Sequence, residues 1–584
     1  MVEFAGFSAS ERPIPRRRLF RSAVFIGILA GCGPGGAVSL NLDSDPPDVR
    51  EDTQDSAPIE DIGGVEDINL VITPPAGTFR GEVEVTLSAA EGVDLYYTTD
   101  GDLPSTRDER YQGPLTFDQS AQLRVLAVDP VGRETYAARS YVRVEGSAAD
   151  FTSNLPLLVL WTDDDLPSSD DSYTSIAFTV LEPGEDGRTR LVGDAALSVR
   201  GGLKIRGSSS SGYPKRSYAF ESWGVDQDDD ADVPILGMPE GSDWVLYAPL
   251  NFDRALMRNA LVYGLSNDVG RYAPRTRFVE VFTVPDGDPV GMDDYVGVYV
   301  FMERIRRGDG RIEIERLDPE DLEPPEITGG YIFKRDRTGD GESGFTAGTA
   351  GGAFTFQQGL VYVTPREEEI PRAQAEYLSD AIDAFADALA AEDHRHPLDG
   401  SHYSEHIDVD AWIDHHILNT FPKNPDAFRL SGYFYKDREG PIVAGPVWDF
   451  DRSMGCASDS RPTDPTWWDP SNITQDTTYL FEHGWYAGLF EDPAFTGPYW
   501  ARWAELLQGP LALDAVLARV DAMAAELAEA APRNFERWRD YPPRGDGTFQ
   551  AEVDHLKGWI QARHAWISDC LARYPDDPRQ CPGE

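Results

Sequence analysis

The chain has 584 residues, of which 52 are lysine or arginine and 101 are aspartate or glutamate, so its formal net charge is −49. A chain of this length is too long for one hydrophobic core and is expected to divide into roughly two to four domains. So acidic a protein repels nucleic acid and anionic membrane surfaces, and we therefore exclude nucleic acid as a partner.

The first 31 residues have the order of a cleavable export signal. Arginines at positions 16, 17, 18 and 21 precede an apolar run at 22–30, which is far shorter than the about 20 residues of a spanning helix. The sequence Leu29-Ala30-Gly31-Cys32 closes the run and resembles a bacterial lipobox, in which the cysteine receives lipid. We expect residues 1–31 to be a signal peptide and Cys32 to be a lipid anchor outside the cytoplasm, facing the periplasm or the cell surface. An unmodified cysteine after an ordinary signal is the alternative.

The next two segments differ in composition. Residues 32–66 are rich in glycine, proline and acidic residues without apolar periodicity, which predicts a solvated, disordered tether. Residues 67–146 contain short alternating runs separated by turn residues, which predict a small all-β, immunoglobulin-like sandwich. Within it, YYTTDGDLP at 96–104 resembles the hairpin of chitobiase C-terminal-type sandwiches. A spacer and a glycan-binding module both remain open.

Residues 150–575 mix the two periodicities. Strand-like runs alternate with segments of helical spacing, and the last part of the chain is mainly helical, so we expect an α+β domain. The expected strands are 157–160, 197–205, 217–221, 278–282 and 296–301, and the expected helices are 254–269, 372–391 and 408–420.

The region 407–451 carries the clearest chemical pattern. A helix is followed by Lys423-Asn424-Pro425-Asp426, a polar break that proline keeps non-helical. A hairpin with strands at 433–436 and 441–444 comes next, and Asp449-Phe450-Asp451 follows it directly. This order resembles the active site of protein kinases, where one carboxylate orients the attacking hydroxyl and another holds the metal that bridges the phosphates.

Further motifs along the chain resemble the spore-coat protein H (CotH) family of atypical kinases, in the order of that family. They lie at 206–209, 214–218, 243–246, 258–261, 272–275, 297–303, 329–332, 424–426, 435–437, 445–451, 552–557 and 563. The resemblance implies an atypical protein-kinase-like domain that uses ATP and magnesium.

The family pattern also implies roles for residues of the acidic loop and of the segment after the hairpin. Asp426 would be the catalytic aspartate, and Asn424 beside it would contribute to nucleotide binding. Asp449 would be the principal magnesium ligand, with Asp451 and Ser431 as further residues of the metal site.

Three residues upstream complete the implied nucleotide site. Arg206 would cradle phosphate, Lys215 would reach the ATP phosphates, and Glu303 would pair with Lys215. The rarity of lysine supports a functional role for Lys215, because the chain has only six lysines against 46 arginines. A lysine that persists in such a composition suggests a need for its compact ammonium group.

Two positions depart from the pattern. Ser431 stands where a kinase loop often has a metal-binding asparagine, and Ser208 stands where the family often has asparagine. Neither change removes a carboxylate, so an active kinase remains the leading hypothesis over a pseudokinase.

These features suggest three hypotheses about function. The leading hypothesis is an extracytoplasmic kinase that phosphorylates Ser or Thr hydroxyls of a surface or secreted protein, or a glycan. The alternative is a non-catalytic surface adhesion or scaffold lipoprotein with a kinase-like ligand-binding domain. Glycoside hydrolysis requires two carboxylates flanking a sugar cleft, and no such pair stands out.

The cysteines add one structural expectation. Cys570 and Cys581 lie close together near the C-terminus, and outside the cytoplasm they are expected to form a disulfide, which would leave Cys456 free.

Overall fold

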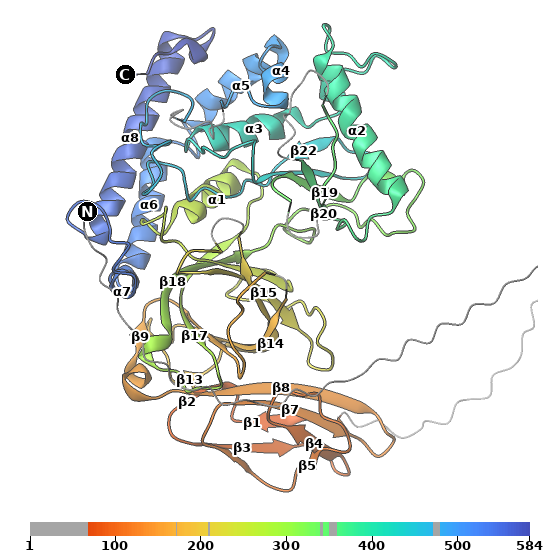
Figure 1. Ribbon diagram of the computed structural model, residues 1–584, viewed down its shortest axis with the longest axis vertical. Coiled ribbons are helices and arrows are strands. Elements are labelled where there is room, and N and C mark those ends of the chain that lie inside the picture. The colour runs from red at the N-terminus through yellow and green to blue at the C-terminus, as the bar shows by residue number, and fades with distance from the viewer. Residues whose placement is uncertain are drawn as a thin grey trace, which may run out of the picture. The chain divides into compact units, whose positions relative to one another are not determined.

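The computed structural model describes residues 68–170, 172–207, 211–338, 343–349, 359–470 and 479–583 (Figure 1). The predicted signal peptide, the predicted lipidation site Cys32, the predicted tether and Ser208 lie outside the described residues. The described residues all fall within one compact unit, Glu66–Glu584. None of the helices in the described ranges combines the length and the apolarity that a membrane crossing requires.

The N-terminal part is a β-sandwich, as predicted. One sheet has the order β1-β3-β6 and the other the order β13-β2-β8-β7-β4-β5. In β3 the side chains of Val85 and Leu87 are buried and their neighbours are exposed, which is the alternation expected of a strand with one solvent face. The strands are β1 (Val71–Thr73), β2 (Gly77–Phe79), β3 (Val83–Ser88), β4 (Asp94–Thr98), β5 (Glu109–Arg110), β6 (Leu115–Phe117), β7 (Ala121–Val128), β8 (Glu134–Arg143) and β13 (Gly193–Asp194).

β13 lies outside the predicted range of the sandwich, yet it pairs with β2. This pairing does not define where one domain ends and the next begins. The predicted boundaries, 67–146 for the sandwich and 150–575 for the kinase-like domain, stay predictions. Short elements follow the sandwich: η1 (Gly146–Asp150) and the paired strands β9 (Thr152–Ser153) and β12 (Thr189–Arg190).

A closed barrel comes next, in the order β10-β11-β14-β15-β16-β18-β17. The sequence predicted most of these strands but not their closure, which depends on the parallel pairing of β10 with β17. Gly201 in β14 permits one close approach, because a Cβ there would come within 2.2 Å of the carbonyl oxygen of Glu221. The strands are β10 (Leu157–Trp161), β11 (Thr174–Leu181), β14 (Leu197–Arg206), β15 (Ser217–Trp223), β16 (Asp243–Tyr247), β17 (Thr276–Val284) and β18 (Tyr295–Glu303).

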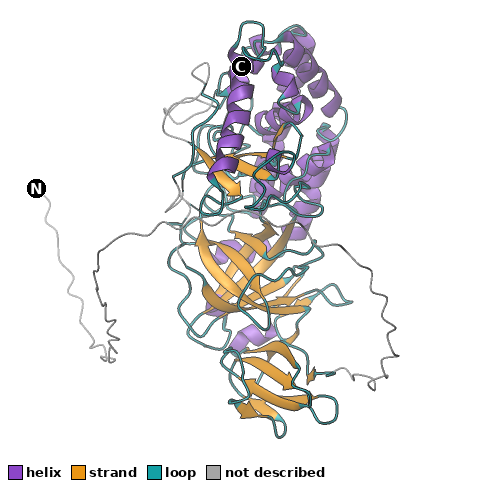
Figure 2. Cartoon of the chain, turned by 90° about the vertical axis from the view of Figure 1, so that its right-hand side faces the viewer, coloured by secondary structure: helices purple, strands orange, loops and turns teal. Residues whose placement is uncertain are grey.

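The remaining part combines helices with a four-stranded sheet of order β20-β19-β21-β22. In Figure 2 the C-terminus lies at the end of the structure where these helices are drawn. The strands are β19 (Tyr331–Arg335), β20 (Leu360–Thr364), β21 (Gly432–Lys436) and β22 (Ile442–Ala444). The helices are α1 (Arg258–Val269), α2 (Arg372–Ala390), α3 (Val409–Thr420), α4 (Trp485–Leu489), α5 (Pro493–Leu506), α6 (Leu513–Leu527), α7 (Ala530–Arg537) and α8 (Phe549–Arg573), with short 3-10 turns at η2 (Met292–Asp294), η3 (Glu326–Thr328), η5 (Tyr403–Glu405) and η6 (Pro578–Gln580).

One large apolar core joins the helices to the sheet. Trp412 on α3 is fully buried and contacts Phe434 of β21 and Trp485 of α4. The predicted helix and hairpin are thus packed against each other, which fixes the loops that follow each of them.

Candidate active site

The loop after α3 places Asn424 and Asp426. Asp408 caps the start of α3 by accepting a hydrogen bond from the Ala411 N–H, and the helix ends at Thr420. The Asn424 side chain, 3% exposed, donates to the side-chain oxygen of Asn419 at 3.2 Å and accepts from the Asp426 N–H at 3.1 Å. Asn424 therefore fixes the backbone on which Asp426 stands.

The carboxylate of Asp426 lies between two arginines. Arg429 donates to its Oδ1 at 2.5 Å and Arg461 donates to the same oxygen at 3.2 Å. The Asp426 side chain is 15% exposed, so it still reaches solvent or a substrate. Both arginines donate to Oδ1, so Oδ2 is left as a hydrogen-bond acceptor.

Asp449 follows the hairpin in a strained conformation. Its φ of +67° is in the left-handed region, which is uncommon for a residue other than glycine. The Asp449 N–H donates to the hydroxyl of Tyr263 at 3.2 Å, and its Oδ2 accepts from the Ser431 hydroxyl at 3.4 Å. Burial, reinforced by the charges of Asp426 and Asp336, raises the pKa of Asp449 to about 6.

Asp451 lies two residues further. Burial, followed by repulsion from Asp449, raises the pKa of its carboxyl well above the ordinary range. Two carboxyls that repel each other in a buried site favour a bound cation, which would remove that repulsion.

Arg206 ends β14 and contributes positive charge to the site. Its guanidinium lies over the ring of Trp448, the residue before Asp449, at 4.9 Å. Its Nη1 is buried and has no hydrogen-bond partner among the described residues. Burial lowers the pKa of Arg206, and Asp449 is among the groups that oppose this effect. A buried, unpaired guanidinium nitrogen beside Asp449 is suited to a phosphate oxygen.

The position of Lys215 does not agree with the prediction that it reaches the ATP phosphates. Its ammonium group is buried and donates to the carbonyl oxygens of Pro249 and Val298 and, at 2.8 Å, to Oδ1 of Asn534. All three N–H bonds are used by the protein, so Lys215 holds the barrel to α7 and has no donor left for ATP phosphates. Burial lowers its pKa well below the usual value.

Glu303 does not pair with Lys215 either. Its side chain is fully buried and bonded to Arg275 at 2.8 Å and to Arg311 at 3.1 Å. The predicted ion pair is therefore wrong, because each partner is satisfied elsewhere. Neither residue contributes a free group to the candidate site.

Asp336 belongs to the site but was not predicted. It follows β19, whose Arg335 pairs with Gly432 of β21, so the strand register brings Asp336 next to Ser431. Its charge is among those that raise the pKa of Asp449. The sequence signal was a carboxylate directly after a buried strand, which is common and cannot be assigned without the pairing of that strand.

The donor set fits magnesium as far as the described residues go. Magnesium prefers oxygen ligands and is usually held by one or two carboxylates together with substrate phosphates. Asp449 and Asp451 offer carboxylates and Ser431 offers a hydroxyl next to Asp449. No group of three His, Cys, Asp or Glu side chains that could hold a metal ion occurs within the described ranges.

The comparisons with known proteins decide the family. The family described as CotH kinase protein matches residues 203–567, which is more than half of the chain. The chain belongs to the CotH kinase family. It is thus a member of a family of atypical protein kinases, and the resemblance seen in its motifs is confirmed.

The N-terminal sandwich of this CotH kinase family member also has a family match. The chitobiase/beta-hexosaminidase C-terminal domain matches residues 74–138, as the hairpin sequence predicted. No curated protein matches the chain.

One solved structure found in the comparison is Bacteroides ovatus mixed-linkage glucan utilization locus SGBP-B in complex with mixed-linkage heptasaccharide. It is 11% identical, covers 53% of this chain and 95% of its own, and has a TM-score of 0.12. At this TM-score the likeness carries no conclusion about the fold or the ligand of the CotH kinase family member.

Proposed function

We propose that this CotH kinase family member is an extracytoplasmic enzyme that transfers the γ-phosphate of ATP, with magnesium, to Ser or Thr hydroxyls of a surface or secreted protein. The observation that carries the proposal is the joining of two loops: Asn424, which holds the Asp426 backbone, also donates to the Asp449 carbonyl at 3.3 Å. One buried amide thus holds the base and the metal-binding carboxylate in register. The unpaired Nη1 of Arg206 supports a phosphate position beside them.

In the proposed reaction Asp426 orients the substrate hydroxyl and takes its proton. The hydroxyl oxygen forms a bond to the γ-phosphorus while the bond to the β-phosphate oxygen breaks, and ADP leaves. Arg206 holds phosphate oxygens, and Asp449, Asp451 and Ser431 would hold the metal. Magnesium, when bound, supplies the positive charge that offsets the charge of the phosphates. Lys215 and Glu303 take no part in this mechanism.

The test is phosphate transfer from labelled ATP to a mixed extracellular extract. We expect transfer by the wild type and at least a hundredfold lower rate for Asp426→Asn, because its amide cannot accept the hydroxyl proton. Asp410→Asn is the matched control, since Asp410 is an exposed carboxylate at the start of α3. If neither the wild type nor Asp426→Asn transfers phosphate while both are folded, catalysis is refuted and a non-catalytic scaffold is favoured.

The location is part of the proposal. The run of arginines, the apolar segment and the lipobox-like sequence support lipidation of Cys32. Labelling of cells with a fatty-acid probe should mark the wild type and leave Cys32→Ser unlabelled. Label that persists in Cys32→Ser would contradict a lipid anchor at this residue.

A further inference from the structure

A single arginine joins the two chain segments that flank Asp426. Arg563 lies on α8 and is fully buried. Its Nη2 donates to the carbonyl oxygen of Thr420 at 2.7 Å and its Nε to that of Phe421 at 3.2 Å, at the end of α3. Its Nη1 donates to the carbonyl oxygens of Pro465 at 3.0 Å and Trp467 at 2.5 Å.

The positively charged guanidinium of Arg563 donates its hydrogen bonds to carbonyl oxygens. No carboxylate lies within ion-pair distance of it in the described part of the chain, and burial lowers its pKa to about 9. Burying a charge without an opposite charge costs folding free energy, and an apolar residue of similar size in its place often gives a protein that is as stable. The planar, forked guanidinium donates to several carbonyl oxygens in a fixed geometry, whereas a lysine ammonium on its flexible stem holds its acceptors less rigidly.

Both segments are connected to the loop that carries Asp426. Asn424 and Asp426 stand a few residues after Phe421, whereas Arg461, which contacts Asp426 at 3.2 Å, precedes Pro465 in the second segment. Lys423 adds a second link between the segments by donating to the carbonyl oxygens of Asp464 and Thr466, both at 2.8 Å. A shift of either segment would therefore displace Asp426.

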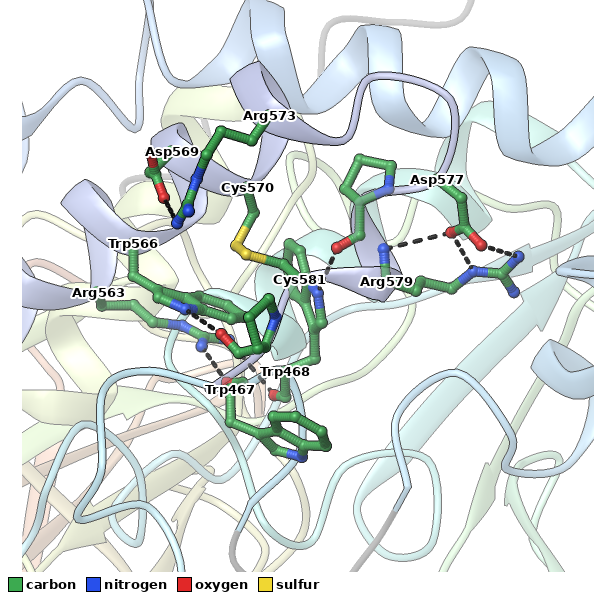
Figure 3. Close-up of a disulfide and its surroundings, with 12 residues drawn as sticks. Trp467, Trp468, Arg563, Trp566, Asp569, Cys570, Arg573, Asp577, Arg579 and Cys581 are labelled. Atoms are coloured by element: carbon green, nitrogen blue, oxygen red, sulfur yellow. Dashed lines mark hydrogen bonds and ion pairs between the residues drawn. A yellow bond between two sulfur atoms is a disulfide. The ribbon is translucent and has the colours of Figure 1, made fainter. Parts of the chain in front are cut away.

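The C-terminal segment holds the two tryptophans that lie beside Arg563, Trp468 and Trp566. Figure 3 shows Arg563 beside Trp566, with its hydrogen bonds directed at the segment that carries Trp467 and Trp468. Trp468 donates from Nε1 to the Pro578 carbonyl oxygen at 2.9 Å, and the Cys570–Cys581 disulfide closes this segment onto α8.

We propose that Arg563 is a positioning residue that sets the place of Asp426 by fixing the end of α3 and the segment 465–468 to α8. The inference rests on the proposed function for its kinetic part. Its structural part, the hold on the loop, stands on the hydrogen bonds alone.

The test compares Arg563→Lys with Arg533→Lys in the full chain. Arg533 is a matched control because it binds Glu280 of the barrel at 2.6 Å and lies on α7. We expect Arg563→Lys to lower the transfer rate at least tenfold while the Kd for ATP changes less than threefold, since small misplacements cost rate rather than affinity. Arg533→Lys should change neither by more than threefold.

Hydrogen–deuterium exchange gives the second readout. Amides of residues 419–430 should exchange at least tenfold faster in Arg563→Lys and at the wild-type rate in Arg533→Lys. If Arg563→Lys does not fold, Arg563→Gln, which keeps two donors, replaces it with the same readouts. An unchanged rate with unchanged exchange over 419–430, or faster exchange throughout the helices, overturns the inference. Should the wild type lack transfer, the proposed function fails, and the exchange over 419–430 still decides on Arg563.

Discussion

The side-chain amide of Asn424 donates a hydrogen bond to the backbone carbonyl of Asp449 at 3.3 Å, across 25 residues of sequence. The hairpin β21–β22 lies between these residues in the chain, so the bond closes the segment into one unit. Any movement of the Asp449 segment is transmitted to the loop that carries Asp426.

Removal of this hydrogen bond should allow the loops that carry Asp426 and Asp449 to move independently. We expect Asn424→Ala to lower phosphate transfer about 10- to 100-fold, because misplacement of catalytic groups by about 1 Å has effects of that size. Single-turnover kinetics with labelled ATP would measure it. Asn154→Ala is the control, since Asn154 makes a single side-chain bond to the Glu526 carbonyl oxygen, far from Asn424 in sequence. Equal rates for both variants would contradict the coupling.

Asp449 should destabilise the protein when no metal is bound. Its folded-state pKa of about 6 is above its ordinary value of 3.8, so the folded state binds more protons than the unfolded state between these values. Stability therefore falls as pH rises from about 4 to 6, and the cost of the charge remains at neutral pH.

Replacement of the Asp449 carboxylate by an amide should remove that cost. We expect Asp449→Asn, with chelator present, to raise the free energy of unfolding at pH 7.5 by about 1 to 3 kcal/mol. At pH 4 the difference should nearly vanish, because the wild-type carboxyl is then protonated. Urea unfolding at the two pH values measures both differences. A variant less stable than the wild type at pH 7.5 would contradict the expectation.

The acidic loop and the Asp-Phe-Asp segment were predictable because their residues are close in sequence and a hairpin fixes their order. Asp426 and Asp449 lie on loops that Asn424 joins, as such a hairpin allows. Arg206, which was predicted to cradle phosphate, lies close enough to Asp449 for their charges to interact, and its phosphate role stays a prediction. Its neighbour at 208 lies outside the described residues.

Lys215, Glu303 and Asp336 show why the rest could not be predicted. The acceptors that bind Lys215 come from residues as distant as Asn534, and sequence spacing does not reveal them. Glu303 likewise meets Arg311 and Arg275 only through folding. Asp336 enters the site through the pairing of β19 with β21, which one residue pattern cannot specify.

Ser431 offers a direct test of the metal site. Its φ of +55° is in the left-handed region, which asparagine tolerates better than serine. An asparagine carbonyl oxygen is also a common ligand of hard cations. We therefore expect Ser431→Asn to fold as well as the wild type and to bind Mn²⁺ about two- to tenfold more tightly, since one added ligand is a small gain.

Electron paramagnetic resonance of Mn²⁺ with ADP present would measure this affinity. Asp449→Asn should weaken it far more than any change at Ser431, and Asp336→Asn should show whether that carboxylate contributes. If Asp449→Asn binds Mn²⁺ as the wild type does, the metal site is not at this aspartate.

The disulfide at the C-terminus should contribute to stability. Cys570 and Cys581 are separated by 11 residues, and closing a loop of this size stabilises the folded state by about 3 kcal/mol in the chain-entropy model. We expect the double variant Cys570→Ser, Cys581→Ser to lose about that amount in urea unfolding under oxidising conditions. Reductant should bring the wild type to the same stability and leave the variant unchanged, because the buried Cys456 thiol is not bonded to another cysteine. A variant as stable as the oxidised wild type would show that other contacts hold the C-terminal segment, such as the bonds of Trp468 and Trp566 to Pro578 and Pro582.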